Sequence, residues 1–262
     1  MKKIYFGSNL KMYKTAADTV AYVKELFRLT EKLDRSQIGL FIIPSYTALM
    51  AVSDAVPHES IMIGAQNMYW EEKGQFTGEI SPVMLEELKV NLVMIGHSER
   101  RHIFGETDFL TNQKVKAALR HGFTALLCVG ETGEEKEYGI SEEVLRRQLK
   151  IGFHGVGSED AGKIIVAYEP VWSIGEKGIP ASSEYAESMH RIIHQTLENI
   201  FGEKGTAIPV LYGGSVNRNN VDCLIRQHSV DGLFVGRAAW QAEAFASLIE
   251  EAVRVINTKI TI

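Results

Sequence analysis

The sequence predicts an α/β fold in which eight parallel strands close into a (β/α)8 barrel surrounded by helices, as one domain over residues 1–262. Short apolar runs alternate with longer helical patterns from end to end, without a linker between them. The runs are mostly continuously apolar, as expected for parallel strands covered on both faces. No glycine-rich dinucleotide-binding turn follows the first run, which disfavours the alternative of an open doubly wound sheet.

The predicted strands are the apolar runs at residues 4–9, 39–43, 61–65, 92–95, 124–129, 164–168, 208–211 and 232–235. The predicted helices are the amphipathic stretches at residues 15–32, 111–121, 141–151, 182–201, 217–227 and 242–257. The first of these helices carries Val20, Val23 and Phe27 on one face at helical spacing. Gly122 and Gly202 are expected to end the helices that precede them.

Composition restricts the classes of function. A formal net charge of −5 without a long basic run argues against nucleic-acid binding, and no apolar stretch reaches the roughly 18 residues that span a membrane. The chain enters a strand without the apolar core of a signal peptide. Cys128 and Cys223 lie far apart, so we expect no metal site, a core position for Cys128, and reduced thiols in the cytoplasm.

Chemistry in a (β/α)8 barrel lies at the carboxyl ends of the strands, and in this chain the distinctive polar residues lie there. They are Asn9, Lys11, Gln66, Asn67, His97, Ser98, Glu99, Glu131, Glu169, Gly213, Gly214, Ser215, Gly236 and Arg237. Glu131 opens a charge run at residues 131–137 that we expect to be the solvated start of a helix.

Glu169 is the first candidate for a reacting group. It directly precedes Pro170, which favours extended geometry at a strand end. The segment 173–180, with Gly175 and Gly178, follows as a loop that could close over the site. A carboxylate shielded from water suits the removal of a proton from carbon, whereas a solvated strand-end carboxylate is the simpler alternative.

Two cationic or titratable side chains accompany it. His97 precedes a helix start, which disfavours the charged imidazole and leaves a neutral ring able to donate to a carbonyl oxygen. Lys11, with Asn9 as a neutral donor, could attract an anionic substrate and stabilise an enediolate. A structural histidine and a surface lysine are the alternatives. Glu99 either forms an ion pair with Arg100 beneath the site or acts in it directly.

The loops after the last two strands predict a phosphate site, because barrels often bind phosphate there with backbone amides. The candidate residues are Gly213, Gly214 and Ser215 after the seventh strand, and Phe234, Gly236 and Arg237 at the end of the eighth. A Gly-Gly-Ser turn alone is a weak signal, and its position after the seventh strand strengthens it.

Several longer motifs occur in one order along the chain. They are Asn9-Leu10-Lys11-Met12, Gly64-Ala65-Gln66-Asn67, Phe76-Thr77-Gly78-Glu79, Gly96-His97-Ser98-Glu99-Arg100-Arg101, Cys128-Val129-Gly130-Glu131-Thr132, Ala167-Tyr168-Glu169-Pro170-Val171-Trp172, Leu211-Tyr212-Gly213-Gly214-Ser215-Val216 and Asp231-Gly232. With them the chain resembles the triosephosphate isomerase family along nearly its whole length.

The resemblance implies a role for each matching residue. Glu169 would be the base, His97 the electrophile, and Asn9 and Lys11 the substrate-binding pair, with Ser98 and Glu99 supporting them. Backbone amides of Gly175, Ser215, Gly236 and Arg237 would hold the phosphate, and no cofactor would be needed. The resemblance also implies a homodimer in which the loop 66–79 enters the partner subunit and brings Thr77 near the partner's active site.

The chain departs from the family pattern at three places. Leu10 replaces the usual tryptophan. The loop usually reads Ile-Gly-Thr-Gly-Lys-Thr-Ala, whereas residues 174–180 read Ile-Gly-Glu-Lys-Gly-Ile-Pro, so that Pro180 stiffens its second hinge. The eighth strand usually ends Gly-Gly-Ala-Ser, whereas residues 236–240 read Gly-Arg-Ala-Ala-Trp. These departures resemble a branch acting on four-carbon ketose phosphates such as erythrulose phosphates.

The leading hypothesis is therefore a cofactor-independent isomerase that interconverts dihydroxyacetone phosphate and glyceraldehyde 3-phosphate through an enediolate. Isomerisation of four-carbon ketose phosphates by the same residues is the second. A non-catalytic phosphosugar-binding barrel is a third, since a fold does not determine a function, and another phosphate-binding barrel enzyme such as a synthase is the last.

Overall fold

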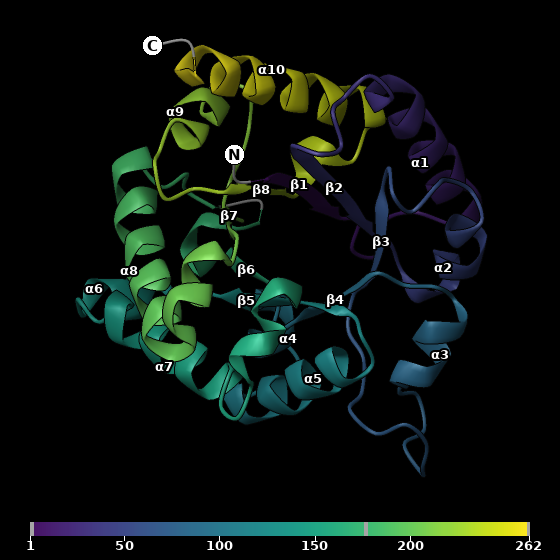
Figure 1. The fold of residues 1–262 in the computed structure, drawn as a ribbon, viewed down its shortest axis with the longest axis horizontal. Helices are drawn as coiled ribbons and strands as arrows, with labels where there is room; N and C mark the ends of the chain where they lie inside the picture. Colours follow the sequence, from purple (N-terminus) through teal and green to yellow (C-terminus); the bar gives the residue numbers. More distant parts are fainter. Residues whose placement is uncertain (1–2, 176–177, 261–262) are drawn as a thin grey trace.

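Eight parallel strands form a closed barrel in which each strand pairs with the next along the chain and the eighth pairs with the first. The computed structural model describes residues 3–175 and 178–260. The strands are β1 (Ile4–Asn9), β2 (Ile38–Ile43), β3 (Met62–Ala65), β4 (Leu92–Ile95), β5 (Thr124–Val129), β6 (Ile164–Tyr168), β7 (Val210–Tyr212) and β8 (Gly232–Val235). Figure 1 shows the helices arranged around the outside of this barrel. The predicted fold class is confirmed.

The helices cover the outer face of the barrel. They are α1 (Ala16–Thr30), α2 (Tyr46–Ser53), α3 (Pro82–Glu87), α4 (Ser98–His102), α5 (Asp108–Arg120), α6 (Gly133–Glu137), α7 (Ser141–Gly152), α8 (Ser183–Phe201), α9 (Val221–Ile225) and α10 (Ala242–Ile260). Helices α2 and α3 were not predicted, because one or two turns show too little apolar periodicity. The starts of α4 and α6 were expected, after His97 and within the charge run 131–137. Gly122 and Gly202 follow the ends of α5 and α8 with φ of 80° and 64°, as predicted.

Several predicted boundaries differ from the structure, and for two elements a local cause is visible. The strand predicted at 208–211 begins at Val210, whose amide donates to the Asp231 carboxylate at 2.9 Å, and it extends to Tyr212. The helix predicted at 217–227 shrinks to α9, because the Asn217 and Asn220 side chains accept from nearby backbone amides and form turns instead. No helix in the described ranges is long and apolar enough to cross a membrane.

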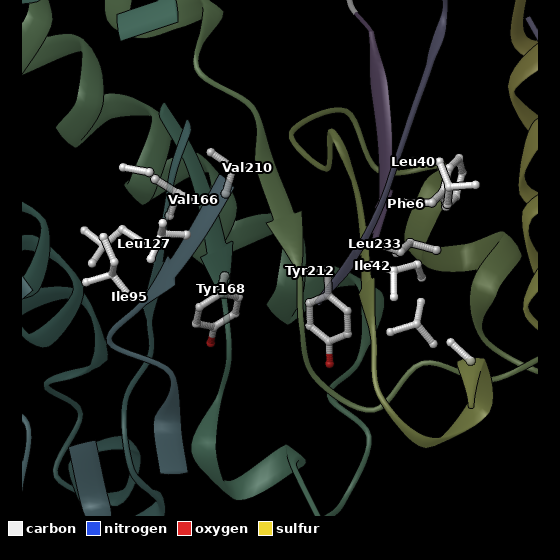
Figure 2. Packing of buried hydrophobic residues seen from close by; sticks show 14 of the residues in the cluster. Phe6, Leu40, Ile42, Ile95, Leu127, Val166, Tyr168, Val210, Tyr212 and Leu233 are labelled. Atoms are coloured by element: carbon white, nitrogen blue, oxygen red, sulfur yellow. The ribbon is translucent and has the colours of Figure 1, made fainter. Parts of the chain in front are cut away.

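The core has two layers. Inside the barrel, the Phe41 and Phe234 rings stack 5.7 Å apart, and Gly7 leaves them room, since a Cβ there would lie 2.0 Å from Phe41. Outside the barrel, alternate strand residues such as Leu127 and Val166 form the larger layer beneath the helices (Figure 2). This alternation holds the carboxyl ends of all the strands at one rigid edge.

Candidate active site

A cavity of about 450 Å³ opens at the carboxyl ends of the strands. Its lining includes twelve of the thirteen residues proposed for the site from the sequence: Asn9, Lys11, His97, Glu99, Glu169, Gly175, Gly213, Gly214, Ser215, Phe234, Gly236 and Arg237. The remaining one, Ser98, contributes its backbone amide to the Glu169 carboxylate. Sequence reasoning therefore placed residues from β1, β4, β6, β7 and β8 at one site.

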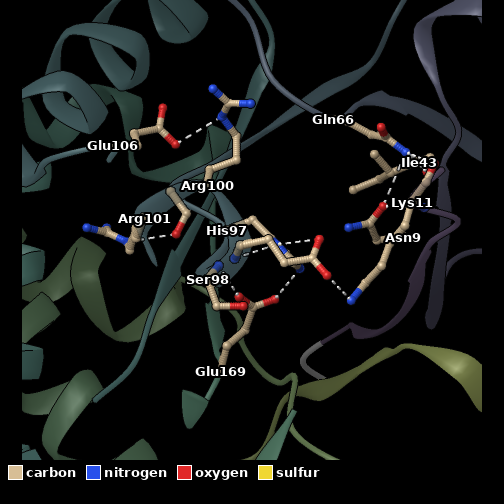
Figure 3. A network of polar contacts seen from close by, with 12 residues as sticks. Asn9, Lys11, Ile43, Gln66, His97, Ser98, Arg100, Arg101, Glu106 and Glu169 are labelled. Carbon is tan, nitrogen blue, oxygen red and sulfur yellow. Dashed lines mark hydrogen bonds and ion pairs between the residues drawn. The ribbon is translucent and has the colours of Figure 1, made fainter. Parts of the chain in front are cut away.

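Glu169 projects into this cavity from the end of β6. Its backbone amide donates to the Val129 carbonyl at 2.7 Å, which continues the strand pairing up to the reacting residue. The side chain is almost fully buried, and Oε2 accepts from the Ser98 amide at 3.1 Å. Oε1 lies 3.4 Å from Nε2 of His97 (Figure 3). The carboxylate is thus held in place while one oxygen faces the imidazole.

His97 is the N-cap of α4, and its Nδ1 accepts from the Glu99 amide at 3.2 Å. A ring nitrogen that accepts from an amide carries no proton, so this hydrogen bond assigns the proton of a neutral ring to Nε2. Nε2 is the atom that faces Glu169 and the cavity. The geometry agrees with the neutral, donating imidazole expected from the sequence.

Asn9 and Lys11 form a tight turn after β1. The Lys11 amide donates to Oδ1 of Asn9 at 2.8 Å, and Lys11 has a φ of 52°, which is uncommon for a residue with a side chain. The Gln66 amide group donates to the Lys11 carbonyl at 2.8 Å and to Asn9 at 3.3 Å. Gln66 follows β3 and had no assigned role, yet it holds this turn in place (Figure 3).

Of the two alternatives for Glu99, the ion pair with Arg100 does not form. Glu99 instead accepts from the ammonium of Lys11 at 2.7 Å, across the mouth of the cavity. Arg100 points the other way, and its Nε lies 3.4 Å from the buried carboxylate of Glu106. Successive residues of a helix point in different directions, which separates the two partners. Glu99 therefore contacts the lysine of the site directly.

Glu131 also differs from its prediction, which made it part of a solvated helix start. Its carboxylate is fully buried and accepts from the Tyr168 hydroxyl at 3.0 Å, the Trp172 indole at 2.8 Å and the Tyr185 hydroxyl at 2.9 Å. Burial, with Glu131 beside it, raises the pKa of Tyr168 well above its usual value. Only the later part of the run, in α6, is largely exposed. The missed signal is that Glu131 follows the buried strand β5 by two residues.

At the other end of the cavity, two turns approach each other. The Ser215 amide donates to Oγ of Ser173 at 3.2 Å, which links the turn after β7 to η2 (Val171–Ser173). Gly175 has a φ of 88°, and Arg237 begins η4 (Arg237–Ala239) with an exposed side chain. The predicted changes at Glu176 and Lys177 of the loop tip lie outside the described residues.

Two aromatic cavity residues were not foreseen from the sequence. Tyr13 and Trp240 line the cavity, although no motif marked them as part of the site, whereas Ser173 begins the segment expected to close over it. Trp240 could have been suspected because it follows Gly236 by four residues, at the end where phosphate was expected. Among the residues that the structure describes, no three histidine, cysteine or acidic side chains group in a way that could hold a metal ion.

A buried carboxylate, a buried imidazole and a partly buried ammonium meet at the carboxyl ends of the strands. This arrangement defines a barrel enzyme of the acid–base class. The profile of the family described as triosephosphate isomerase matches residues 4–252. The chain belongs to the triosephosphate isomerase family, and it is an isomerase.

Relatives with two different activities resemble the chain. The L-erythrulose-1-phosphate isomerase of Rhizobium etli is 45% identical, over 94% of this chain and 91% of that protein. The triosephosphate isomerase of Dictyoglomus thermophilum is 39% identical, over 95% of this chain and 100% of that protein. The crystal structure of triosephosphate isomerase from Bartonella henselae superposes with a TM-score of 0.85 at 33% identity, covering 96% of this chain and 99% of that chain.

Proposed function

We propose that the protein isomerises short phosphorylated ketoses by proton transfer through an enediolate, without a cofactor. The 3.4 Å approach of His97 Nε2 to Glu169 inside the cavity carries this proposal. Glu169 removes the proton from the carbon beside the carbonyl, and the C–H electron pair becomes the double bond of the enediolate. His97 and Lys11 stabilise the oxyanion, and Asn9 lines the same end of the cavity.

The proton then returns to the former carbonyl carbon, which moves the carbonyl group by one position. Glu169 or His97 carries protons between the two carbons and between the two oxygens. No atoms are gained or lost, and no oxidant or reductant is required. Burial of Glu169 supports this proposal, because exclusion of water protects the enediolate from side reactions.

We assign the phosphate to the end of the cavity formed by the turns after β6, β7 and β8. Backbone amides of Gly175, Ser215, Gly236 and Arg237 would bind its oxygens, and Gly213, Gly214 and Phe234 would shape the floor. Arg237 is among the residues at the same end, and a guanidinium turned toward the cavity would favour a dianion there.

We propose four-carbon erythrulose phosphates as the preferred substrates. The side chain at Arg237 and the proline at position 180 change the phosphate end and the loop, while Glu169 and His97 are kept. The 45% identity to an L-erythrulose-1-phosphate isomerase supports the same substrate. On L-erythrulose 1-phosphate, Glu169 would remove the proton from the carbon that carries the hydroxymethyl group. Return of a proton to the former carbonyl carbon would give D-erythrulose 4-phosphate.

Triose phosphates are the second candidate, because relatives of 39% and 41% identity are named triosephosphate isomerases. Measurement of kcat/KM on both erythrulose phosphates and both triose phosphates decides between them. A tetrulose value at least tenfold above the triose value is expected. Faster triose turnover would make the protein a triosephosphate isomerase, and phosphosugar binding without any turnover would favour a binding protein.

We also propose a homodimer in which the loop 66–79 docks on a second copy. The loop projects beyond the barrel in Figure 1, and its residues from Glu71 to Glu79 are exposed. Exposed apolar side chains follow the neighbouring strands β1 to β4: Met12, Met50, Phe76, Val83, Ile103 and Phe104. Light scattering should give twice the 29.2 kDa chain mass, and Thr77→Arg should yield monomers. A monomeric unmodified chain would exclude this interface.

A cytoplasmic location completes the proposal. Cys128 and Cys223 are both free, and Cys128 is buried in the barrel. Unpaired thiols are common where the compartment is reducing.

A further inference from the structure

The segments that follow β1 and β8 are joined by an aromatic contact at the edge of the cavity. The indole Nε1 of Trp240 donates to the carbonyl oxygen of Asn9 at 3.2 Å. The Trp240 ring lies 4.2 Å from the Tyr13 ring, with their planes tilted by 37°. Both rings line the cavity beside Lys11. Neither residue has a role in the proton transfer described above.

The turn that these rings contact needs to be held in place. Lys11 has a positive φ, which residues with a side chain keep only when surrounding contacts impose it. Contacts from β1, β2 and β3 supply part of this constraint: the Leu10 amide donates to Ile43, the Lys11 amide to the Asn9 side chain, and Gln66 to the Lys11 carbonyl. Trp240 supplies a contact from the opposite side, where β8 closes the barrel.

Trp240 is itself anchored by the short helix η4. Its amide donates to the Arg237 carbonyl at 3.2 Å, and the Ala239 amide donates to Gly236 at 2.9 Å. The Tyr22 hydroxyl of α1 donates to the Ala239 carbonyl at 2.6 Å and ties the same segment to the helical layer. The indole is therefore connected by backbone hydrogen bonds to the glycine proposed to bind phosphate.

We propose that Trp240 is a positioning residue that joins the phosphate-binding turn at Gly236 to the turn of Asn9 and Lys11. By fixing the Asn9 carbonyl, the indole sets where the Lys11 ammonium lies relative to the reacting carbons. The ring does not need to touch those carbons. The effect of Trp240 on kcat can be measured only if the proposed isomerisation is correct. Its effect on ligand binding depends on the site geometry alone.

The test is Trp240→Phe, which keeps a ring beside Tyr13 and removes the N–H that donates to Asn9. Loss of one neutral hydrogen bond should lower kcat about two- to tenfold, with KM within twofold of the unmodified enzyme. Two ligands report separately on the two ends of the cavity. Binding of 2-phosphoglycolate, whose planar carboxylate resembles the enediolate, should weaken by the same factor as kcat. Binding of inorganic phosphate should not change.

Tyr22→Phe is the matched control, since it removes one hydrogen bond to the same segment without touching Asn9. Its kcat should equal that of the unmodified enzyme even if its melting temperature falls. Unchanged kcat and 2-phosphoglycolate binding in Trp240→Phe would overturn the inference, as would an equal loss of kcat in Tyr22→Phe. If the unmodified protein turns over neither triose nor tetrulose phosphates, the proposed function fails, and the two binding measurements still decide the role of Trp240.

Discussion

Oε1 of Glu169 and Nε2 of His97 lie 3.4 Å apart at the ends of strands β6 and β4. The backbone and Cγ of Glu169 are closely packed against two glycines. The Glu169 backbone closes against Gly130, where a Cβ would come within 2.0 Å of the Glu169 carbonyl oxygen, and against Gly213, where a Cβ would lie 2.9 Å from its Cγ. Because the Glu169 backbone is held in place, the distance between its carboxylate and a substrate carbon depends on the length of the side chain.

Glu169→Asp should retract the carboxylate by about 1 Å while leaving the rest of the cavity unchanged. Such a displacement of a reacting group costs on the order of a hundredfold in rate. We expect kcat to fall by about that factor and KM to change less than threefold, measured by steady-state kinetics on whichever ketose phosphate the enzyme prefers. An equal loss in kcat and in substrate affinity would contradict the assignment of Glu169 as the base.

Glu131→Gln tests how much the buried Glu131 carboxylate and its hydrogen bonds stabilise the fold. The carboxylate accepts hydrogen bonds from Tyr168, Trp172 and Tyr185, whereas an amide would turn an N–H toward one of these donors. We expect a loss of about 1–3 kcal/mol in the free energy of unfolding, or about 3–10 °C in melting temperature.

Thermal unfolding measures this loss, and Glu134→Gln is the control variant. Glu134 lies in the same charge run but is exposed, so its neutralisation should change the free energy of unfolding by less than about 0.5 kcal/mol. Equal melting temperatures for the two variants would mean that the Glu131 hydrogen bonds contribute nothing to stability.

The contrast between Glu169 and Glu131 shows how far the sequence alone leads. Both follow buried strands, and the carboxyl-end rule placed Glu169 correctly in the cavity with His97 and Lys11. The same rule says nothing about which side chains turn toward the helices. The donors to Glu131 lie 37, 41 and 54 residues further along the chain, so its burial depends on tertiary packing.

The accuracy of the predicted element boundaries also depends on how much is determined locally by the sequence. Strands buried on both faces were located to within two residues, because most positions in them are apolar. The short helices α4 and α6 were invisible to periodicity, and their starts depend on individual capping contacts, such as the Thr132 hydroxyl accepting from Glu135. Trp240 was missed for a related reason: a lone aromatic residue after a strand carries no signal about the carbonyl that it contacts.

The two cysteines should differ sharply in reactivity. Cys128 is fully buried, and burial, with Glu169 nearby, raises the pKa of its thiol well above the usual value. Cys223 is exposed. Since the thiolate is the reactive form, 5,5′-dithiobis(2-nitrobenzoate) should modify only Cys223 in the native protein and both residues in urea. Native Cys223→Ser should therefore remain unlabelled, and rapid labelling of that variant would show that the barrel interior opens to solvent.

His190 of α8 should make folding stability depend on pH. The ring packs against those of Tyr168 and Tyr212, with centroid distances of 5.7 Å and 6.2 Å, and its Nδ1 contacts the Ser229 carbonyl at 3.2 Å. Burial, reinforced by the neighbouring His194, lowers the pKa of His190 to about 3. In the unfolded chain an ordinary histidine has a pKa of about 6.5.

The sign follows from which state binds the proton. Between about pH 6.5 and pH 3 the unfolded chain takes up a proton at this position and the folded chain does not, so stability is retained above pH 6.5 and falls below it. At pH 5 the contribution is about 2 kcal/mol relative to pH 7. Urea unfolding at both values should show that His190→Gln loses about 2 kcal/mol less than the unmodified protein. The exposed His154 provides the control, since His154→Gln should keep the full pH dependence, and identical losses in all three proteins would refute the assignment.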